Sequence, residues 1–269
     1  MRYLIINGSP RKGNTWKLVE LAKSQLLEID DTTEFEEIHL ANVNLPFCIG
    51  CSNCFRLGHE KCPHYSITNN IIQAIEKADG VIISSTTYNT RETALLKNLF
   101  DHFCYMLHRQ CFFKSKALVI TTTGGVGAKS AAKSIASTLK GIGFNRCYLF
   151  SCSSISWNNY IPKEKSKAYL RKTVAKFNKD VLSKKLHSPS YLVLIPYNLF
   201  RGMSLYYTKG SEYETKDGEH WTDSERKNTV YDKSVKVPPH KILFGNMFYL
   251  LGKTIGKNKN MMVTYKKSE

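Results

Sequence analysis

Two groups of residues in this chain have types and spacings that can do chemistry. The first is the loop at 8–15, Gly-Ser-Pro-Arg-Lys-Gly-Asn-Thr, which follows the apolar run 4–6 and precedes a helical pattern. Backbone N–H groups at a helix start, the positive end of the helix dipole, the hydroxyls of Ser9 and Thr15 and the cation of Arg11 can converge on one anion. The loop therefore predicts a phosphate cradle.

Asn14 limits the kind of phosphate group that this loop can hold. A triphosphate-binding loop has a lysine directly after its second glycine, whereas Asn14 stands there in this chain. The loop also lacks the Gly-x-Gly-x-x-Gly of a dinucleotide-binding fold. It thus favours the single phosphate of a mononucleotide. The alternative interpretation is that Ser9 and Asn14 are ordinary turn and helix-cap residues.

The second group is a set of cysteines in the irregular segment 41–64, namely Cys48, Cys51, Cys54 and Cys62. Four thiolates at short spacings can ligate a [4Fe–4S] cluster, while zinc, free thiols or a redox disulfide fit the same residues. No signal peptide is visible, so the chain is expected to be cytoplasmic, where cysteines favour metal or redox chemistry over structural disulfides. The remaining cysteines are expected to be small buried apolar residues.

The composition is that of a folded, strongly basic protein. Of its 269 residues 42% are hydrophobic and 12% aromatic, and the formal net charge is +17. The cations are densest at 163–185, where they alternate with apolar residues in a helix-like pattern. This pattern predicts a basic helix face in solvent, and we expect no nucleic-acid partner.

Strand, loop and helix alternate five times along the first two thirds of the chain. The alternation predicts an α/β fold, a doubly wound five-stranded parallel sheet with right-handed crossovers and helices on both faces. The expected strands are 4–6, 35–40, 80–84, 117–120 and 147–150, and the expected helices include 14–27, 67–78, 93–107 and 129–139.

Three loops at strand ends form the expected ligand site. Ligands of such sheets bind outside the carboxyl ends of the strands. The first, third and fourth strands end in small polar loops with glycines or hydroxyls, at 8–15, 85–91 and 121–127. We expect a phosphate at the first loop and a planar ring between the other two, with Tyr88 offering an aromatic face. For 121–127, a plain strand-to-helix turn is the alternative.

Three motifs in this order resemble the NADPH-dependent FMN reductase family of flavodoxin-like proteins. They are Gly8-Ser-Pro-Arg-Lys-Gly-Asn-Thr15, the Tyr88 loop followed by Ala94-Leu-Leu-Lys-Asn-Leu-Phe-Asp101, and Thr122-Thr-Gly-Gly125. The resemblance covers roughly residues 1–185 and is closest to the branch of iron–sulfur flavoproteins, which carries cysteines after the second strand. It implies a flavodoxin-like fold, FMN as cofactor and NAD(P)H as reductant.

The resemblance also implies the site residues. The FMN phosphate would be held by Ser9, Arg11, Asn14 and Thr15, and the ring would be bordered by Thr86, Thr87, Tyr88, Asn89, Thr123, Gly124 and Gly125. Cys48, Cys51, Cys54 and Cys62 would hold the [4Fe–4S] cluster. The ring loop departs from the family, because Ser85-Thr-Thr-Tyr88 replaces Ser-Pro-Val-Tyr and the following Gly-Ser is missing. No catalytic side chain is expected, since the flavin carries the chemistry.

Composition changes beyond residue 186, so we expect a flavodoxin-like domain at 1–186 and a C-terminal extension at 187–269. The extension reads as an apolar stretch at 191–200, a polar loop at 208–237 and a helix at 238–252. We expect it to pack on the domain or on a partner subunit. Contact with an anionic membrane is the less favoured alternative, suggested by the lysines that follow, Lys253, Lys257, Lys259, Lys266 and Lys267.

The leading hypothesis is an FMN-dependent oxidoreductase that takes hydride from NAD(P)H and passes electrons to a small-molecule or redox-protein acceptor, as a homodimer. One alternative is a flavin electron carrier, with or without an iron–sulfur cluster, that is reduced by acidic ferredoxin-like partners docking on its basic surface. A second alternative is a flavin-free binding protein that keeps the flavodoxin-like scaffold.

Overall fold

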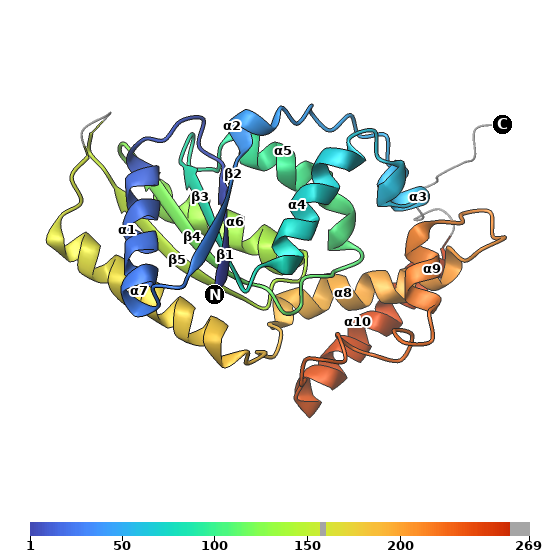
Figure 1. Ribbon diagram of the computed structural model, residues 1–269. Helices are drawn as coiled ribbons and strands as arrows, with labels where there is room; N and C mark the ends of the chain where they lie inside the picture. The colour runs from blue at the N-terminus through green and yellow to red at the C-terminus, as the bar shows by residue number, and fades with distance from the viewer. Residues whose placement is uncertain (157–159, 259–269) are drawn as a thin grey trace.

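The computed structural model describes residues 1–156 and 160–258. One parallel sheet lies at the centre of the first part of the chain (Figure 1), in the strand order β2-β1-β3-β4-β5. Its strands are β1 (Arg2–Asn7), β2 (Glu34–His39), β3 (Gly80–Thr86), β4 (Lys116–Thr123) and β5 (Arg146–Ser153). This is the flavodoxin-like strand order. The predicted α/β fold with a five-stranded parallel sheet is confirmed.

Helices cover both faces of the sheet (Figure 1). One face packs against α1 (Asn14–Ile29) and α7 (Glu164–Ser183), and the other against α4 (Tyr65–Lys77), α5 (Ala94–His102) and α6 (Ala128–Gly141). Short elements lie between them, namely α2 (Leu40–Val43), α3 (Asn53–Arg56), η1 (His59–Lys61) and η2 (Cys104–Leu107).

The apolar run of β1 is buried on both faces, as predicted for a central parallel strand. Tyr3 and Ile5 belong to the core under α1 and α7, whereas Leu4 and Ile6 belong to the core on the opposite face. Successive side chains of a strand point to opposite faces, so one continuous apolar run fills both layers.

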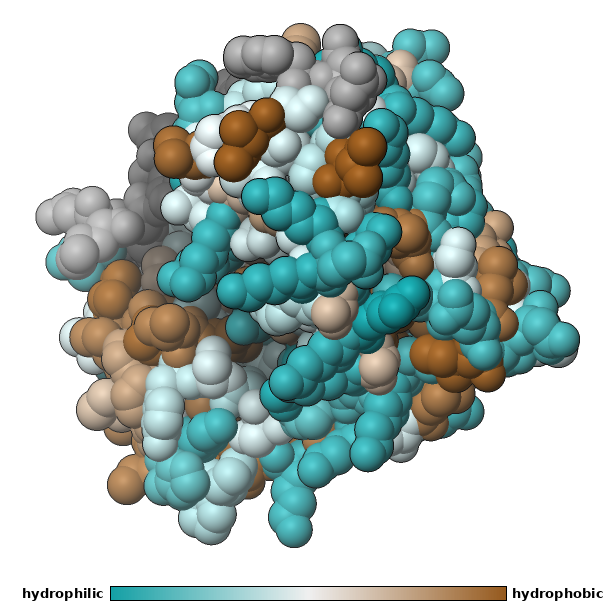
Figure 2. All heavy atoms as spheres, turned by 90° about the vertical axis from the view of Figure 1, so that its left-hand side faces the viewer, coloured by the Kyte–Doolittle hydropathy of each residue, from teal (hydrophilic) through white to brown (hydrophobic). Residues whose placement is uncertain are grey.

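The basic segment 163–185 contains α7, a helix with one buried apolar face. Leu170, Val174, Phe177 and Val181 point into the core, while most of its lysines are exposed. Figure 2 looks onto the side of the molecule that carries α1 and α7, and hydrophilic side chains dominate the centre of that face. The arrangement is that of the predicted basic helix face in solvent.

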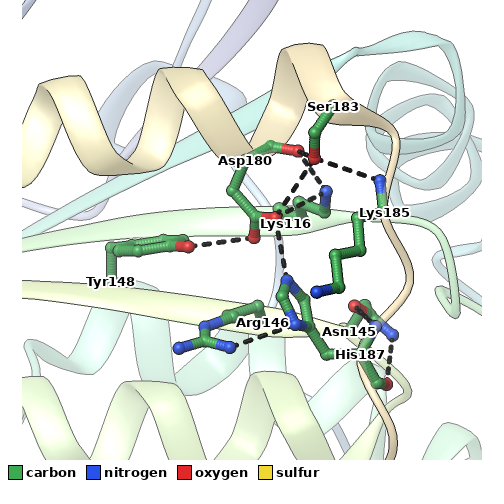
Figure 3. Close-up of polar contacts among 8 residues, drawn as sticks. All are labelled: Lys116, Asn145, Arg146, Tyr148, Asp180, Ser183, Lys185 and His187. Carbon is green, nitrogen blue, oxygen red and sulfur yellow. Dashed lines mark hydrogen bonds and ion pairs between the residues drawn. The ribbon is translucent and has the colours of Figure 1, made fainter.

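A network of polar side chains lies at the amino end of the sheet (Figure 3). Lys116 of β4 and Asp180 of α7 are both buried, and Lys116 Nζ lies 3.2 Å from Asp180 Oδ1. The Tyr148 hydroxyl donates to Asp180 Oδ2 at 2.9 Å, and His187 Nε2 lies 2.8 Å from Asp180 Oδ1. Because Arg146 can only donate to His187 Nδ1, the ring carries its proton on Nε2 and donates it to Asp180.

The extension forms its own small core beside the sheet domain. It contains α8 (Tyr191–Met203), η3 (Ser204–Tyr206), α9 (Lys216–Thr222) and α10 (Pro239–Lys257). The polar stretch predicted as a loop at 208–237 contains α9, and its Trp221 is fully buried. Trp221 Nε1 donates to the carbonyl of His108 at 3.1 Å, so this side chain joins the extension to the domain. Lys259, Lys266 and Lys267 lie outside the described residues.

Candidate functional site

The first predicted loop runs from the end of β1 to the start of α1. Gly8 is required there, because a Cβ atom at this position would lie 2.8 Å from Leu96 Cβ and 3.2 Å from the carbonyl oxygen of Ser84. Gly13 is the N-cap of α1, and no side chain caps this helix start within the residues that the structure describes. The alternative interpretation of Asn14 as the cap is therefore wrong. The N–H groups of the first helical turn stay available for a ligand.

Side chains of this loop tie it to the loops that follow β3 and β4. Ser9 Oγ accepts a hydrogen bond from the backbone N–H of Thr86 at 3.0 Å. Thr15 Oγ1 lies 2.6 Å from Thr122 Oγ1. Ser9, Thr15 and Thr122 are buried. The three predicted loops thus meet at the carboxyl edge of the sheet.

A fourth loop, which sequence analysis missed, reaches the same place. Asn14 Nδ2 donates to the carbonyl of Ser156 at 3.0 Å, and Ser154 Oγ donates to the carbonyl of Thr123 at 3.0 Å. Both serines follow β5, which is four residues longer than the predicted strand 147–150, from Arg146 to Ser153. The carboxyl-edge rule could have included this loop, because β5 pairs with β4.

The loop after β3 makes a tight turn that presents Tyr88. Tyr88 and Arg91 exchange two backbone hydrogen bonds, of 3.1 and 2.9 Å. Between them Asn89 and Thr90 have φ angles of 48° and 63°, in the left-handed region that a β-branched residue rarely adopts. A Cβ atom at Gly127 would lie 2.8 Å from Thr90 Cγ2, so Gly127 lets the turn approach the β4 loop closely.

These loops enclose a cleft at the carboxyl edge of the sheet. The predicted residues on its wall are Ser9, Arg11, Asn14, Thr15, Thr86, Thr87, Tyr88, Thr123 and Gly124. Asn89 and Gly125 do not line it. Asn89 forms the tight turn, and Gly125 donates its N–H to Thr123 Oγ1 at 3.3 Å. Residues not predicted on the wall are Pro10, Gly13, Thr122, Ser154 and Ser156.

Two polar atoms of the cleft residues are buried without a partner among the described residues, Asn14 Oδ1 and Thr87 Oγ1. Buried polar atoms are nearly always hydrogen-bonded in folded proteins. A ligand that carries hydroxyl or N–H donors would satisfy both atoms. The phosphate, ribityl hydroxyls and ring N–H of FMN match this cleft, which combines an open helix start, a cation and unpaired acceptors.

The predicted cysteine loop packs on α5, where the backbone N–H of Cys48 donates to Asn98 Oδ1 at 3.2 Å. Cys48 and Cys51 are exposed, whereas Cys54 and Cys62 are half-buried. Burial raises the pKa of the Cys62 thiol, and neighbouring Cys54, Cys51 and Cys48 raise it further. The four predicted cysteines therefore lie in one region of the molecule.

Cys104 of η2, which was predicted to be a small buried apolar residue, also reaches this region. Its thiol forms a hydrogen bond with that of Cys54, and this bond together with burial raises the pKa of Cys54. Across residues 1–156 and 160–258, no three Cys, His, Asp or Glu side chains are arranged to hold a metal ion. The cysteines in this arrangement do not fit a cluster.

One buried arginine of the sheet domain, Arg109, connects the cysteine loop to the extension. Arg109 donates to the carbonyl of Cys54 at 2.5 Å and to that of Phe55 at 3.4 Å. The same guanidinium forms an ion pair with Asp217 of α9, and both side chains are 8% exposed. His108 Nδ1 lies 2.7 Å from the other carboxylate oxygen of Asp217. Asp217 thus orients the arginine that holds the loop.

Asp217→Asn should loosen this loop, because an amide pairs with Arg109 more weakly than a carboxylate does. We expect the thiol of Cys54 to be alkylated by iodoacetamide about tenfold faster, equivalent to about 1.4 kcal/mol less protection against local opening. Mass spectrometry of the labelled peptide measures the rate. Asp101→Asn, which alters the exposed pair with Lys97, is the control. Equal rates for Asp217→Asn and the unaltered protein would contradict the clamp.

The family follows from the match of this chain to known sequences. The family model for NADPH-dependent FMN reductases matches residues 1–152. This match covers more than half of the chain, which therefore belongs to the NADPH-dependent FMN reductase family.

Curated relatives are each similar to part of the chain. An iron–sulfur flavoprotein of Clostridioides difficile is 34% identical over 128 residues, which are 47% of this chain and 56% of that protein. An iron–sulfur flavoprotein of Methanocaldococcus jannaschii is 40% identical over 102 residues, which are 38% of this chain and 51% of that protein. The chain thus matches about half the length of these curated relatives.

Solved structures share the fold. An azoreductase of Bacillus anthracis superposes with a TM-score of 0.51 at 16% identity, over 68% of this chain and 99% of the azoreductase. An FMN-dependent NADH-azoreductase of the same species, solved in complex with FMN, has a TM-score of 0.51 at 15% identity, over 65% of this chain and 99% of its own.

Proposed function

We infer that the protein is an FMN-dependent oxidoreductase that uses NAD(P)H as reductant and passes electrons to an acceptor. The observation that carries this proposal is the cleft itself, where, among residues 1–156 and 160–258, no side chain caps the start of α1 and the atoms Asn14 Oδ1 and Thr87 Oγ1 have no partner. Membership of the FMN reductase family supports it.

The two sides of the cleft would bind different parts of FMN. The first-turn N–H groups of α1, the Thr15 hydroxyl and the Arg11 guanidinium would bind the phosphate. Thr87 and Tyr88 would border the ring, and Asn14 Oδ1 would accept from a hydroxyl. Bound FMN supplies the acceptance of hydride from NAD(P)H and the onward delivery of electrons. The protein's own part would be to orient the ring, and Tyr88, which would border it, is 55% exposed.

Reconstitution tests this function. The purified protein is incubated with FMN, freed of unbound cofactor by gel filtration, and mixed without oxygen with NADH or NADPH. We expect one FMN per chain and loss of the flavin absorbance within seconds. A protein that retains no FMN would overturn the proposal and leave the flavin-free scaffold. Retained FMN that neither nicotinamide cofactor reduces would favour an electron carrier.

The cysteine loop supports the electron carrier as a second candidate. Several relatives carry the name iron–sulfur flavoprotein, and the loop has four cysteines at short spacings. Since the described side-chain arrangement is not a ligand set, the loop would have to rearrange around a cluster. Iron and sulfide analysis after purification without oxygen tests this. Stoichiometric iron that disappears in Cys51→Ser, with FMN retained, would favour the carrier, and absence of iron would exclude the cluster.

A further inference from the structure

The helix α10 buries small residues and exposes large apolar ones, the reverse of an ordinary surface helix. Its buried residues are three glycines, Gly245, Gly252 and Gly256. Five of its large apolar side chains point outward with exposures between 39% and 75%, namely Ile242, Leu243, Met247, Leu250 and Leu251. Others, such as Phe244 and Tyr249, are half-buried. A helix on the surface of a water-soluble domain normally turns its large apolar side chains inward. The outer face of α10 therefore requires an apolar partner.

The glycines bring α10 into backbone contact with α8, which lies beside it (Figure 1). A Cβ atom at Gly252 would lie 2.4 Å from the carbonyl oxygen of Leu199, and one at Gly202 would lie 2.3 Å from that of Tyr249. Such close approach through small residues buries little apolar surface. It is the packing used by helix pairs in lipid, where large apolar side chains face the surroundings.

Lysines flank the apolar outer face of α10. Lys241 precedes its exposed apolar residues, and Lys253 and Lys257 follow them. Neither α8 nor α10 contains an aspartate or a glutamate. An apolar stripe with cationic ends suits the boundary between headgroups and acyl chains of an anionic membrane, because lysine stems can bring their charges to the headgroups.

The amino-terminal turn of α8 adds to this face. The ring of Tyr191 packs edge-on against that of Phe244 of α10, with centroids 4.8 Å apart. The next residue, Leu192, is 80% exposed. Tyrosine is common at the level of lipid headgroups. Of the helices that the structure describes, none is long and apolar enough to cross a membrane, so the pair α8–α10 would lie along the surface.

We propose that the outer face of α10, together with the first turn of α8, docks the protein on the surface of an anionic lipid bilayer. The charges decide against a second copy of this chain as the occupant. A symmetric dimer through this face would place two lysine-flanked surfaces without carboxylates against each other. An anionic bilayer offers both an apolar layer and the opposite charge.

Co-sedimentation with vesicles tests the docking surface. One set of vesicles contains phosphatidylcholine and phosphatidylglycerol at three to one, and the other contains phosphatidylcholine alone. The full chain should sediment with the anionic vesicles and stay in solution with the neutral ones. Leu243→Asp/Leu250→Asp should lower the apparent affinity at least tenfold. Leu27→Asp/Leu182→Asp, with the same charge change at exposed leucines of α1 and α7, should bind as the unaltered protein does.

Two further measurements separate lipid docking from misfolding and from self-association. Circular dichroism establishes that each variant is folded, and sedimentation velocity gives its oligomeric state. In the variant Met247→Trp, the fluorescence of the new tryptophan should be quenched by lipids brominated on their acyl chains. Failure of the unaltered protein to sediment, equal binding by both leucine pairs, or unquenched tryptophan would overturn the proposal. If the unaltered protein is a dimer, and Leu243→Asp/Leu250→Asp dissociates it while Leu27→Asp/Leu182→Asp does not, the face would be assigned to a second copy of this chain instead.

Discussion

Replacing Arg11 and Asn14 together with alanine should weaken FMN binding about 100-fold. Both side chains line the cleft. A hydrogen bond from Arg11 to the charged phosphate contributes about 1.5–3 kcal/mol, and one from a hydroxyl to Asn14 Oδ1 contributes about 0.5–1.5 kcal/mol. Losing both removes about 3 kcal/mol, or about two factors of ten in the dissociation constant. Quenching of flavin fluorescence during titration of FMN with the protein measures the constant.

A neighbouring lysine provides the control for this double variant. Lys12 belongs to the same loop but is not on the cleft wall, and its Nζ lies 3.6 Å from Glu37 Oε2. Lys12→Ala removes one positive charge and should leave FMN affinity within about twofold, because exposed pairs contribute little. The melting temperature without FMN should fall by no more than about 2–4 °C in the double variant, which loses the hydrogen bond from Asn14 Nδ2 to the Ser156 carbonyl. Unchanged FMN affinity there would remove the phosphate assignment, whatever the fold.

Asp180→Ala should lower the free energy of unfolding by about 3–5 kcal/mol, because it leaves the buried ammonium of Lys116 without its counter-charge. It also removes the acceptor of Tyr148 and His187. Urea unfolding followed by circular dichroism measures the loss. Asp180→Ala/Lys116→Met, which removes both charges, should recover part of it.

The same carboxylate gives a pH dependence with a definite sign. Burial alone would raise the pKa of Asp180, but hydrogen bonds from His187, Tyr148 and Lys116 hold the pKa below its usual 3.8. A carboxyl group with a lowered pKa stabilises the fold above its unfolded pKa, and this contribution is lost as the pH falls below 3.8 toward the folded value. Stability of the unaltered protein should therefore fall more steeply in this range than that of the double variant.

An exposed pair on the same helix provides the comparison for Asp180. Glu164 of α7 pairs with Lys167 at 2.7 Å but is 85% exposed. Glu164→Ala should leave the unfolding midpoint almost unchanged, since water already solvates both partners. Equal urea midpoints for Asp180→Ala and the unaltered protein would show that the network around Asp180 contributes nothing to the free energy of unfolding.

The sequence alone was sufficient to predict the sheet and the position of the cleft. Short apolar runs such as 4–6 that end in a glycine-bearing loop are typical of central parallel strands, because they have no polar face to turn to water. Parallel strands all end at one edge, so the polar loops 8–15, 85–91 and 121–127 had to meet there. The family resemblance then suggested which of their residues would face FMN.

Contacts between distant segments decided what the sequence left open. The pairing of β5 with β4 brought Ser154 and Ser156 to the cleft. The residues Lys116 and Asp180, 64 positions apart, meet only after α7 packs on the sheet.

The extension shows most clearly which features follow from the sequence and which follow from tertiary contacts. The sequence determined that 238–252 is helical and apolar, since helix formation depends on local propensity and spacing. Which side of α10 is buried depended on its fit to α8. Only the tertiary structure could decide that the three glycines face inward and the leucines outward, because close backbone contact requires residues without side chains.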